Sequence, residues 1–320
     1  MSRTAVGVPT IFGISRVPWQ IRFVMLGCIW GMSFLLIKVG DEGFAPVQVS
    51  LGRMVFGTMI LLLVLLTQGV KLPKGGLVWF HVAIAAILLN SLPYSLFAYG
   101  ELHTTSVLAG IFNATVPLFT VPIALLMLPN ERLSGQRLTG LIIGFIGVLV
   151  VLGIWRGAAG GELVGDLLCL GAAASYALGF PYTRKYLTGR SDSMFGLVAA
   201  QLMSGTLELA IVAPFLSGVP TTLPVKSLGS ILLLGTLGTG IAYVLQFGLI
   251  RDVGATAAST VAYLILLIAV AAGILVLHEP LAWYQPLGAV VVILGIVRSQ
   301  GMMLDMQRLR MVKLLVQRRQ

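Results

Sequence analysis

Residues 131–147 read ERLSGQRLTGLIIGFIG, and residues 279–295 read EPLAWYQPLGAVVVILG. The two stretches start with Glu131 and Glu279, which lie 148 positions apart. The same offset relates further identical pairs: Leu133 and Leu281, Gly140 and Gly288, Gly147 and Gly295, Ala109 and Ala257, and Ala114 and Ala262. Matched spacing of this kind predicts one structural unit that occurs twice, over about 20–155 and about 162–300.

Outward from this repeat, long apolar runs predict ten membrane-spanning helices. A helix needs roughly 20 apolar residues to cross the hydrocarbon core of a bilayer. The expected spans of the first unit are about 20–38, 47–68, 77–99, 104–128 and 135–154. Those of the second unit are about 163–183, 194–216, 227–250, 255–277 and 281–299.

The composition agrees with a chain embedded in a membrane. Hydrophobic residues make up 58% and charged residues 10% of the 320 residues, whereas soluble domains carry about 45–50% and about 25%. The mean hydropathy is +0.99. Soluble enzymes and disordered chains are therefore excluded, and we predict an all-α integral membrane protein. Cys28 and Cys169 lie in apolar runs, so neither a disulfide framework nor a thiolate metal site is expected.

Basic residues set the expected orientation. With the N-terminus in the cytoplasm, all of the 21 basic residues fall in cytoplasmic segments except Lys38, Arg53, Arg156 and Lys226. This bias is the positive-inside pattern, so both termini are expected in the cytoplasm. Since each unit has five spans, the second unit enters the membrane from the opposite side. Inverted repeats of this kind are common in secondary transporters.

The two ends of the chain are expected to lie outside the repeats. Residues 1–19 form a cytoplasmic segment, and the apolar run after it has no small-residue cleavage site, so we expect this run to be retained. Residues 301–320 place apolar residues at near-helical spacing between basic ones. This pattern predicts an amphipathic helix on anionic inner-leaflet lipid. A solvated basic tail that only enforces topology is the open alternative.

Several motifs resemble those of a known family. The first unit contains residues 30–34 (WGMSF), Lys38, Arg53, residues 113–120 (NATVPLFT) and residues 130–133 (NERL). The second contains residues 249–256 (LIRDVGAT) and 278–281 (HEPL). In this order and spacing the chain resembles the EamA-type transporters of the drug/metabolite transporter (DMT) superfamily. The resemblance implies a ten-helix inverted-repeat fold with a central cavity, and transport of small metabolites or drugs, often out of the cell.

Charged residues inside the spans are candidate functional groups, because an intramembrane charge costs at least about 2.5–3.5 kcal/mol at a helix centre. Arg53 either holds an anionic group of the substrate or pairs with Glu208 as a structural brace. Lys38 ends the first span and either acts as a gate or extends to the outer surface. Glu208 is the one acid that we predict well inside a span. It is a candidate for proton coupling unless an ion pair with Arg53 keeps it charged.

Two further glutamates lie in the repeated loops. Glu131 and Glu279 each precede an expected helix, where a negative charge interacts favourably with the helix dipole. We therefore expect structural roles for both.

Neutral polar side chains within the spans either line a central cavity or hydrogen-bond neighbouring helices. The cavity candidates are Asn90, Tyr94, Asn113, Tyr176, Tyr243, Gln246 and Tyr263. Proline removes a backbone donor, and broken helices at membrane depth are typical of transporter sites. Pro93 and Pro117 are therefore predicted hinges.

These features predict a secondary transporter of a small metabolite or drug-like solute that works by alternating access, with export favoured by the resemblance. No HExxH, nucleotide-binding loop or catalytic elbow supports an enzyme. We expect no cofactor, metal site or nucleic-acid partner. The location expected is the cell inner membrane or plasma membrane, with a homodimer as a candidate assembly. A channel-like facilitator and a non-transporting membrane scaffold stay open as alternatives.

Overall fold

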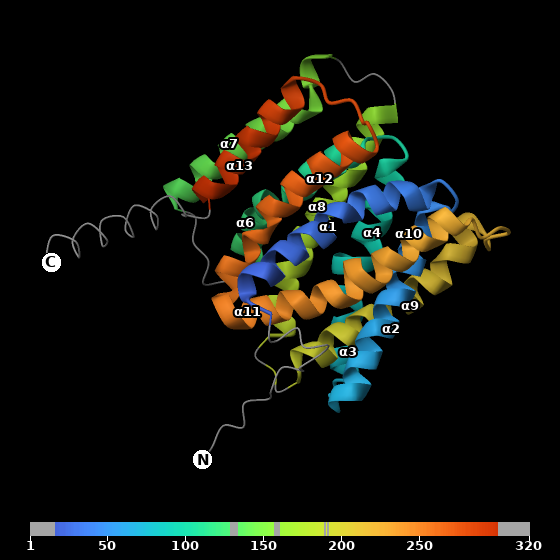
Figure 1. The fold of residues 1–320 in the computed structure, drawn as a ribbon. Helices are drawn as coiled ribbons and strands as arrows, with labels where there is room; N and C mark the ends of the chain where they lie inside the picture. The colour runs from blue at the N-terminus through green and yellow to red at the C-terminus, as the bar shows by residue number, and fades with distance from the viewer. Residues whose placement is uncertain (1–16, 129–133, 157–160, 189, 191, 300–320) are drawn as a thin grey trace, which may run out of the picture.

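The structure, a computed structural model, describes residues 17–128, 134–156, 161–188, 190 and 192–299. Every regular element within these residues is helical (Figure 1). Eight helical segments are long and apolar enough to cross a membrane, and two further apolar helices are shorter. The predicted all-α membrane fold is therefore confirmed at this level. Glu131 and the expected amphipathic tail lie outside the described residues.

The helices follow one another in two similar series. The first series is α1 (Trp19–Asp41), α2 (Pro46–Gln68), α3 (Gly76–Ala86), the π-helical turn η2 (Ile87–Ser91), α4 (Leu92–Glu101), α5 (Ser106–Asn113), α6 (Val116–Met127), α7 (Gly135–Leu152) and the 3-10 turn η3 (Ile154–Arg156). The second is α8 (Gly161–Tyr186), α9 (Met194–Ser217), α10 (Val225–Gly235), the π-helical turn η4 (Thr236–Ile241), α11 (Ala242–Ser259), α12 (Val261–Val276) and α13 (Tyr284–Ser299).

The offset between the two sequence stretches extends to whole helices. α2 begins at Pro46 and α9 at Met194, which again lie 148 positions apart. The π-helical turns η2 and η4 interrupt corresponding helices at corresponding places. Thr58 of α2 and Thr206 of α9 are themselves equivalent by this offset, and their hydroxyls hydrogen-bond at 2.9 Å. A contact between equivalent residues lies on the axis that relates the two series, so this axis passes between α2 and α9.

Glycines bring α7 and α13 into backbone contact, and the two helices lie side by side in Figure 1. A Cβ on Gly140 would lie 2.7 Å from the carbonyl oxygen of Gly295, and a Cβ on Gly295 would lie 2.7 Å from that of Gly140. Gly147 and Gly288 are related in the same way at 2.9 Å. Because the earlier glycine of each helix meets the later one of the other, the helices run antiparallel. The offset of 148 relates Gly140 to Gly288 and Gly147 to Gly295. Applied to the contact between Gly140 and Gly295, it therefore gives the contact between Gly288 and Gly147, so the seam is symmetric.

Capping groups explain several helix boundaries. The Thr105 side chain accepts a hydrogen bond from the Leu108 amide at the start of α5, and Ser134 accepts one from Arg137 at the start of α7. Both satisfy amides that have no partner within the helix. α2 and α7 are followed directly by Gly69 and Gly153, whose φ angles of 62° and 58° lie in the left-handed region that glycine adopts most readily.

Four of the expected spans are interrupted in the structure. The span predicted over 77–99 divides into α3, η2 and α4, and that over 227–250 divides at η4. The span predicted over 104–128 breaks between α5 and α6, and that over 255–277 breaks at Thr260, between α11 and α12. The non-helical Gly254, at φ 83°, lies in the predicted gap between the spans 227–250 and 255–277. Pro93 and Pro117, the predicted hinges, both lie in the first turn after a break, where a missing amide proton costs little.

The glycine contact between α7 and α13 predicts a strong effect of added side-chain volume. Gly140→Val or Gly288→Val should lower the free energy of unfolding by about 1–3 kcal/mol, because the new methyl groups meet backbone atoms of the facing helix. Gly229→Val in α10 is the matched control, since a Cβ there meets nothing within 4 Å. Thermal unfolding of the purified proteins in detergent measures the difference. Equal unfolding temperatures for Gly288→Val and the control would contradict the contact.

Candidate functional site

A buried arginine joins the two series of helices. Arg53 of α2 is 7% exposed. Its Nε donates to Thr239 Oγ1 at 2.9 Å, and its Nη2 donates to the Gly238 carbonyl at 3.4 Å. Its guanidinium carbon lies 3.8 Å from the centre of the Tyr94 ring, a cation–π distance. Arg53 of one series is therefore held by η4 of the other.

Asn90 of η2 is the second centre of this site. Its Nδ2 donates to the hydroxyls of Tyr94 and Tyr243, at 3.2 Å each. Its Oδ1 accepts from Nε2 of Gln201 in α9. Asn90 is fully buried, so these bonds satisfy an amide that would otherwise destabilise the fold.

The two centres are equivalent by the repeat. Arg53 and Gln201 lie 148 positions apart, as do Asn90 and Gly238. Arg53 contacts Gly238, and Gln201 contacts Asn90, so each series reaches with one polar side chain to the π-helical turn of the other. π-Helical turns often occur at functional sites. The geometry is symmetric, whereas the chemistry differs, because only the first series contributes a cation.

Aromatic side chains lie around the two centres. The indole Nε1 of Trp30 donates to the Gly238 carbonyl at 3.0 Å. Tyr243 stacks on Phe247 with ring centres 6.1 Å apart, and Tyr176 contacts Phe97 at 6.3 Å. A cation among aromatic walls with a few oriented polar groups is the composition that small-molecule sites use.

Glu208 lies close to this site, and its partner is Ser91 and not Arg53, with which an ion pair was considered. Its Oε2 accepts from the hydroxyl of Ser91 in η2 at 2.6 Å, while its Oε1 has no hydrogen-bond partner. Arg53, in turn, bonds to Thr239 and Gly238. Among the described residues, no ion pair forms between Arg53 and Glu208.

Lys38 lies near the end of α1. Its Nζ donates to the carbonyl of Glu101 and, at 2.8 Å, to that of Thr104. Lys38 therefore holds the connection between α4 and α5. The side chain of Lys38 therefore does not extend to the outer surface, which was the alternative to a role as a gate.

Glu279 stabilises a helix N-terminus, but not that of the helix which follows it. Its carboxylate accepts from the Ser106 amide at 2.9 Å, the Ser106 hydroxyl at 2.8 Å and the Val107 amide at 3.1 Å. Glu279 therefore has a structural role at a helix N-terminus, as expected, but the helix is α5 and not the one that follows Glu279 in the sequence.

Three of the cavity candidates lie apart from the hydrogen-bonded group. Asn113 and Gln246 are half-buried, and no hydrogen bond to another described residue involves either amide. Tyr263 packs against the cluster of Leu118 and Val292, and its hydroxyl has no partner there. The structure thus brings Arg53, Asn90, Tyr94 and Tyr243 together, with Tyr176 nearby, and leaves the other three separate.

Sequence patterns missed several residues of the site. Gln201, Thr239, Ser91 and Trp30 contribute hydrogen bonds, and the offset of 148 applied to Arg53 points to Gln201. Glu101 was also missed. It ends α4, is 0% exposed and has no partner for either carboxyl oxygen. The sequence did not indicate that an acid at the end of a span would be fully buried.

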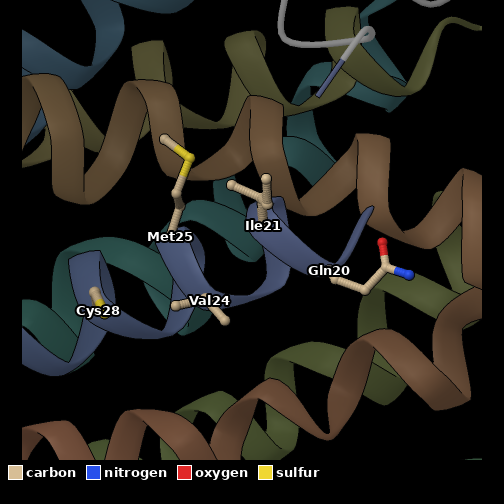
Figure 2. A pocket seen from close by; sticks show the side chains of 5 residues that line it. All are labelled: Gln20, Ile21, Val24, Met25 and Cys28. Carbon is tan, nitrogen blue, oxygen red and sulfur yellow. The ribbon is translucent and has the colours of Figure 1, made fainter. Parts of the chain in front are cut away.

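Grooves on the surface lie apart from this buried group. An apolar groove of about 410 Å³ lies along α1. Figure 2 shows the side chains that line it, which are Gln20, Ile21, Val24, Met25 and Cys28. A second groove of about 390 Å³ runs between α2, α9 and α10 and includes Phe44 and Leu228. Neither is lined by a predicted cavity residue. Exposed apolar surface of this kind is typical of helices that contact lipid.

Comparison with known proteins places the chain in a family. The model of the EamA-like transporter family matches residues 18–153 and 163–299. The uncharacterized transporter YoaV of Bacillus subtilis is 27% identical over 280 residues, which cover 85% of this chain and 95% of YoaV. The uncharacterized inner membrane transporter YedA of Escherichia coli is 28% identical over 277 residues, which cover 84% of this chain and 86% of YedA.

A solved crystal structure shares the fold. Its TM-score is 0.59 at 17% sequence identity, and the match covers 86% of this chain and 98% of that one. The family match spans both series of helices, and the relatives named above are transporters. The chain is therefore a multi-pass membrane transporter that belongs to the EamA-like transporter family.

Proposed function

We propose that the chain is a secondary transporter that moves a small metabolite or drug-like solute across the membrane by alternating access, with export as its direction. The observation that carries the proposal is the symmetric pair of contacts in which Arg53 reaches Gly238 and Gln201 reaches Asn90. A solute bound between two equivalent halves is exposed to one side or the other when the halves exchange conformations.

The proposed topology has ten spans with both termini in the cytoplasm. α12 and α13 are the two shorter helices, and each has 16 residues. At 1.5 Å per residue they reach about 24 Å, close to the core of a thin bilayer. Residues 20–155 and 162–300 are the two inverted repeats in this proposal, and 1–19 and 301–320 are cytoplasmic. The basic bias of the cytoplasmic segments supports this orientation and an attraction of the tail to anionic lipid.

We place the solute at Arg53, Asn90, Tyr94, Tyr176 and Tyr243. The guanidinium has a hydroxyl, a carbonyl and an aromatic face as partners, none of which carries a negative charge. An anionic group of the solute would therefore gain a charge-assisted hydrogen bond there. Asn113, Gln246 and Tyr263 stay proposed as cavity residues because their polar groups have no bond to another described side chain that binding would break.

The remaining candidates have proposed roles in the cycle. Pro93 and Pro117 lie beside helix breaks and serve as hinges. Lys38 joins α1 to the connection between α4 and α5 and serves as a gate at the outer end. Glu208, with one free carboxyl oxygen beside η2, serves in proton coupling. A cell inner membrane or plasma membrane is the proposed location, and a homodimer the proposed assembly.

The substrate proposal predicts a specific loss in an Arg53 variant. A screen of labelled metabolites with proteoliposomes first identifies a transported solute. Arg53→Gln should then raise KM for that solute about tenfold to about a hundredfold, since a hydrogen bond to a charged group contributes about 1.5–3 kcal/mol. Arg53→Lys should lose less. Arg298→Gln is the matched control, because Arg298 is exposed and bonds only weakly to Thr139, at 3.4 Å.

Other outcomes of this screen would overturn parts of the proposal. Flux that does not saturate would support the channel-like facilitator, and the lack of flux for every solute would support the scaffold. An unchanged KM in Arg53→Gln would remove Arg53 from the binding site and leave transport itself intact.

The coupling role predicts a second, separable loss. In Glu208→Gln vesicles a pH gradient should no longer drive accumulation of the solute, while exchange without a gradient continues, because the amide cannot release a proton. Glu42→Gln is the control, since Glu42 is half-exposed and pairs with Lys226 on the surface. Gradient-driven accumulation that survives in Glu208→Gln would exclude Glu208 from coupling.

A further inference from the structure

Glu101 is a buried carboxyl group that the proposed transport site does not use. It is the last residue of α4 and is 0% exposed, and neither of its carboxyl oxygens has a hydrogen-bond partner. Backbone packing explains the burial. A Cβ on Gly100 would lie 3.0 Å from the Gly165 carbonyl, and one on Gly165 would lie 2.7 Å from that of Gly100, so α4 and α8 are in direct contact beside Glu101.

Charged groups from several elements face Glu101. Lys38 and Asp41 of α1, Glu279 from the segment before α13 and Arg53 of α2 all act electrostatically on its carboxyl group. Lys38, however, donates to the backbone carbonyls of Glu101 and Thr104. Among the described residues, Lys38 forms no ion pair with the carboxyl group of Glu101 or with that of Asp41. Asp41 also has two carboxyl oxygens without a partner.

The other titratable side chains near Glu101 are hydrogen-bonded to other residues, buried in the packing of α4 and α8, or exposed. Asp166 of α8 accepts from the Thr104 hydroxyl at 2.7 Å, and Glu279 caps α5. The Cys169 thiol is fully buried against Gly100, and a Cβ on that glycine would lie 2.7 Å from its sulfur. His103 is exposed and contacts Gly165 through its backbone and Cβ. Glu101 is thus surrounded by groups that leave its carboxyl oxygens free.

The nature of the ligand follows from this surrounding. A carboxylate without hydrogen bonds is unstable in a buried site, whereas a neutral carboxyl group is tolerated far better. A metal ion does not fit, because the described residues hold no cluster of three or more acidic, cysteine or histidine side chains with suitable geometry, and the Lys38 ammonium would repel a cation. A proton needs only one carboxyl group.

We propose that Glu101 is a proton-binding site of this transporter, and that its proton keeps the α4–α8 contact at this end of the bundle closed. When Glu101 binds a proton, the carboxylate becomes a neutral acid and stays buried. When it releases the proton to water, the charged group needs hydration, and the contact at Gly100 and Gly165 opens to admit it. In the proposed orientation, this end of the bundle faces the outside of the cell. The inference rests on the proposed function only for the side of the membrane to which the proton is released.

Cys169 reports directly on this contact, because its thiol lies against Gly100. In a Cys28→Ser background it is the one remaining cysteine of the chain. The purified protein is labelled with a maleimide between about pH 6 and about pH 9, and each rate is divided by that of a free thiol to remove thiol ionisation. We expect the corrected rate to rise about tenfold per pH unit below the midpoint of Glu101 release.

Matched variants separate this site from the other carboxyl groups. Glu101→Gln should keep Cys169 slowly labelled at every pH, since the amide imitates the neutral acid, and infrared difference spectra should lose one protonated-carboxyl band. Glu42→Gln, which changes a half-exposed surface carboxylate, should behave like the Cys28→Ser protein.

Two results would overturn the inference. One is a corrected labelling rate in the Cys28→Ser protein that does not change with pH, a measurement that needs no change at Glu101. The other is the same pH response in Glu101→Gln as in the Cys28→Ser protein. Both measurements are made without a solute, so they can fail while transport is observed, or succeed while it is not.

Discussion

The backbone contact between α7 and α13 is the interaction on which the arrangement of the two series depends. Both helices carry glycines seven positions apart, and the antiparallel contact pairs Gly140 with Gly295 and Gly147 with Gly288. In a membrane, helices associate through close packing rather than through the hydrophobic effect. Glycine allows the closest approach, so the same sequence stretch, used twice, forms a self-complementary seam. The Thr58–Thr206 bond places the axis of that seam between α2 and α9.

Symmetry of the backbone then allows asymmetry of the side chains. Equivalent helices bring Arg53 and Gln201 to equivalent places, and equivalent π-helical turns present Gly238 and Asn90 to them. The glycine offers a bare carbonyl, which suits a guanidinium donor, whereas the asparagine offers an acceptor to a glutamine and two donors to tyrosines. One architecture therefore provides one cationic and one neutral half of a site, which a solute with one charged end would bind in a single orientation.

Hydropathy located the helical segments well, because the cost of placing polar groups in lipid is a local property of the sequence. The breaks in these segments were missed, except at Pro93 and Pro117. The π-helical turns depend on packing against other helices, and no local pattern marks them, whereas the kink at Gly254 coincides with the predicted gap between two spans. The repeated spacing was informative well beyond its own residues, since the same offset relates α2 to α9 and η2 to η4.

The residues of the candidate site were predictable where a charge stood out in an apolar run. They were less predictable where only the position of a polar residue within a span was known. Arg53 stood out because an arginine within an apolar run is rare, and it does lie at the centre of a buried group. Tyr263 and Asn113 were cavity candidates because they are polar residues within spans, but a position within a span does not determine which face of the helix a side chain occupies. Glu101 escaped attention because the expected span ended before it, and its burial comes from the Gly100–Gly165 contact between helices distant in sequence.

The distribution of charge within the bundle separates fixed contacts from exchangeable ones. Arg22 pairs with Asp252 near the start of α1, and Glu279 caps α5 with three hydrogen bonds. In such contacts a charge meets an opposite charge or several donors, so a competing solute would have to replace a strong partner. Arg53 instead meets the Thr239 hydroxyl, the Gly238 carbonyl and the Tyr94 ring, which are neutral. An anionic group that displaces a neutral partner forms a stronger bond than the one it breaks. In the transport cycle that we propose, this difference favours binding at the centre while the ends of the helices keep their contacts.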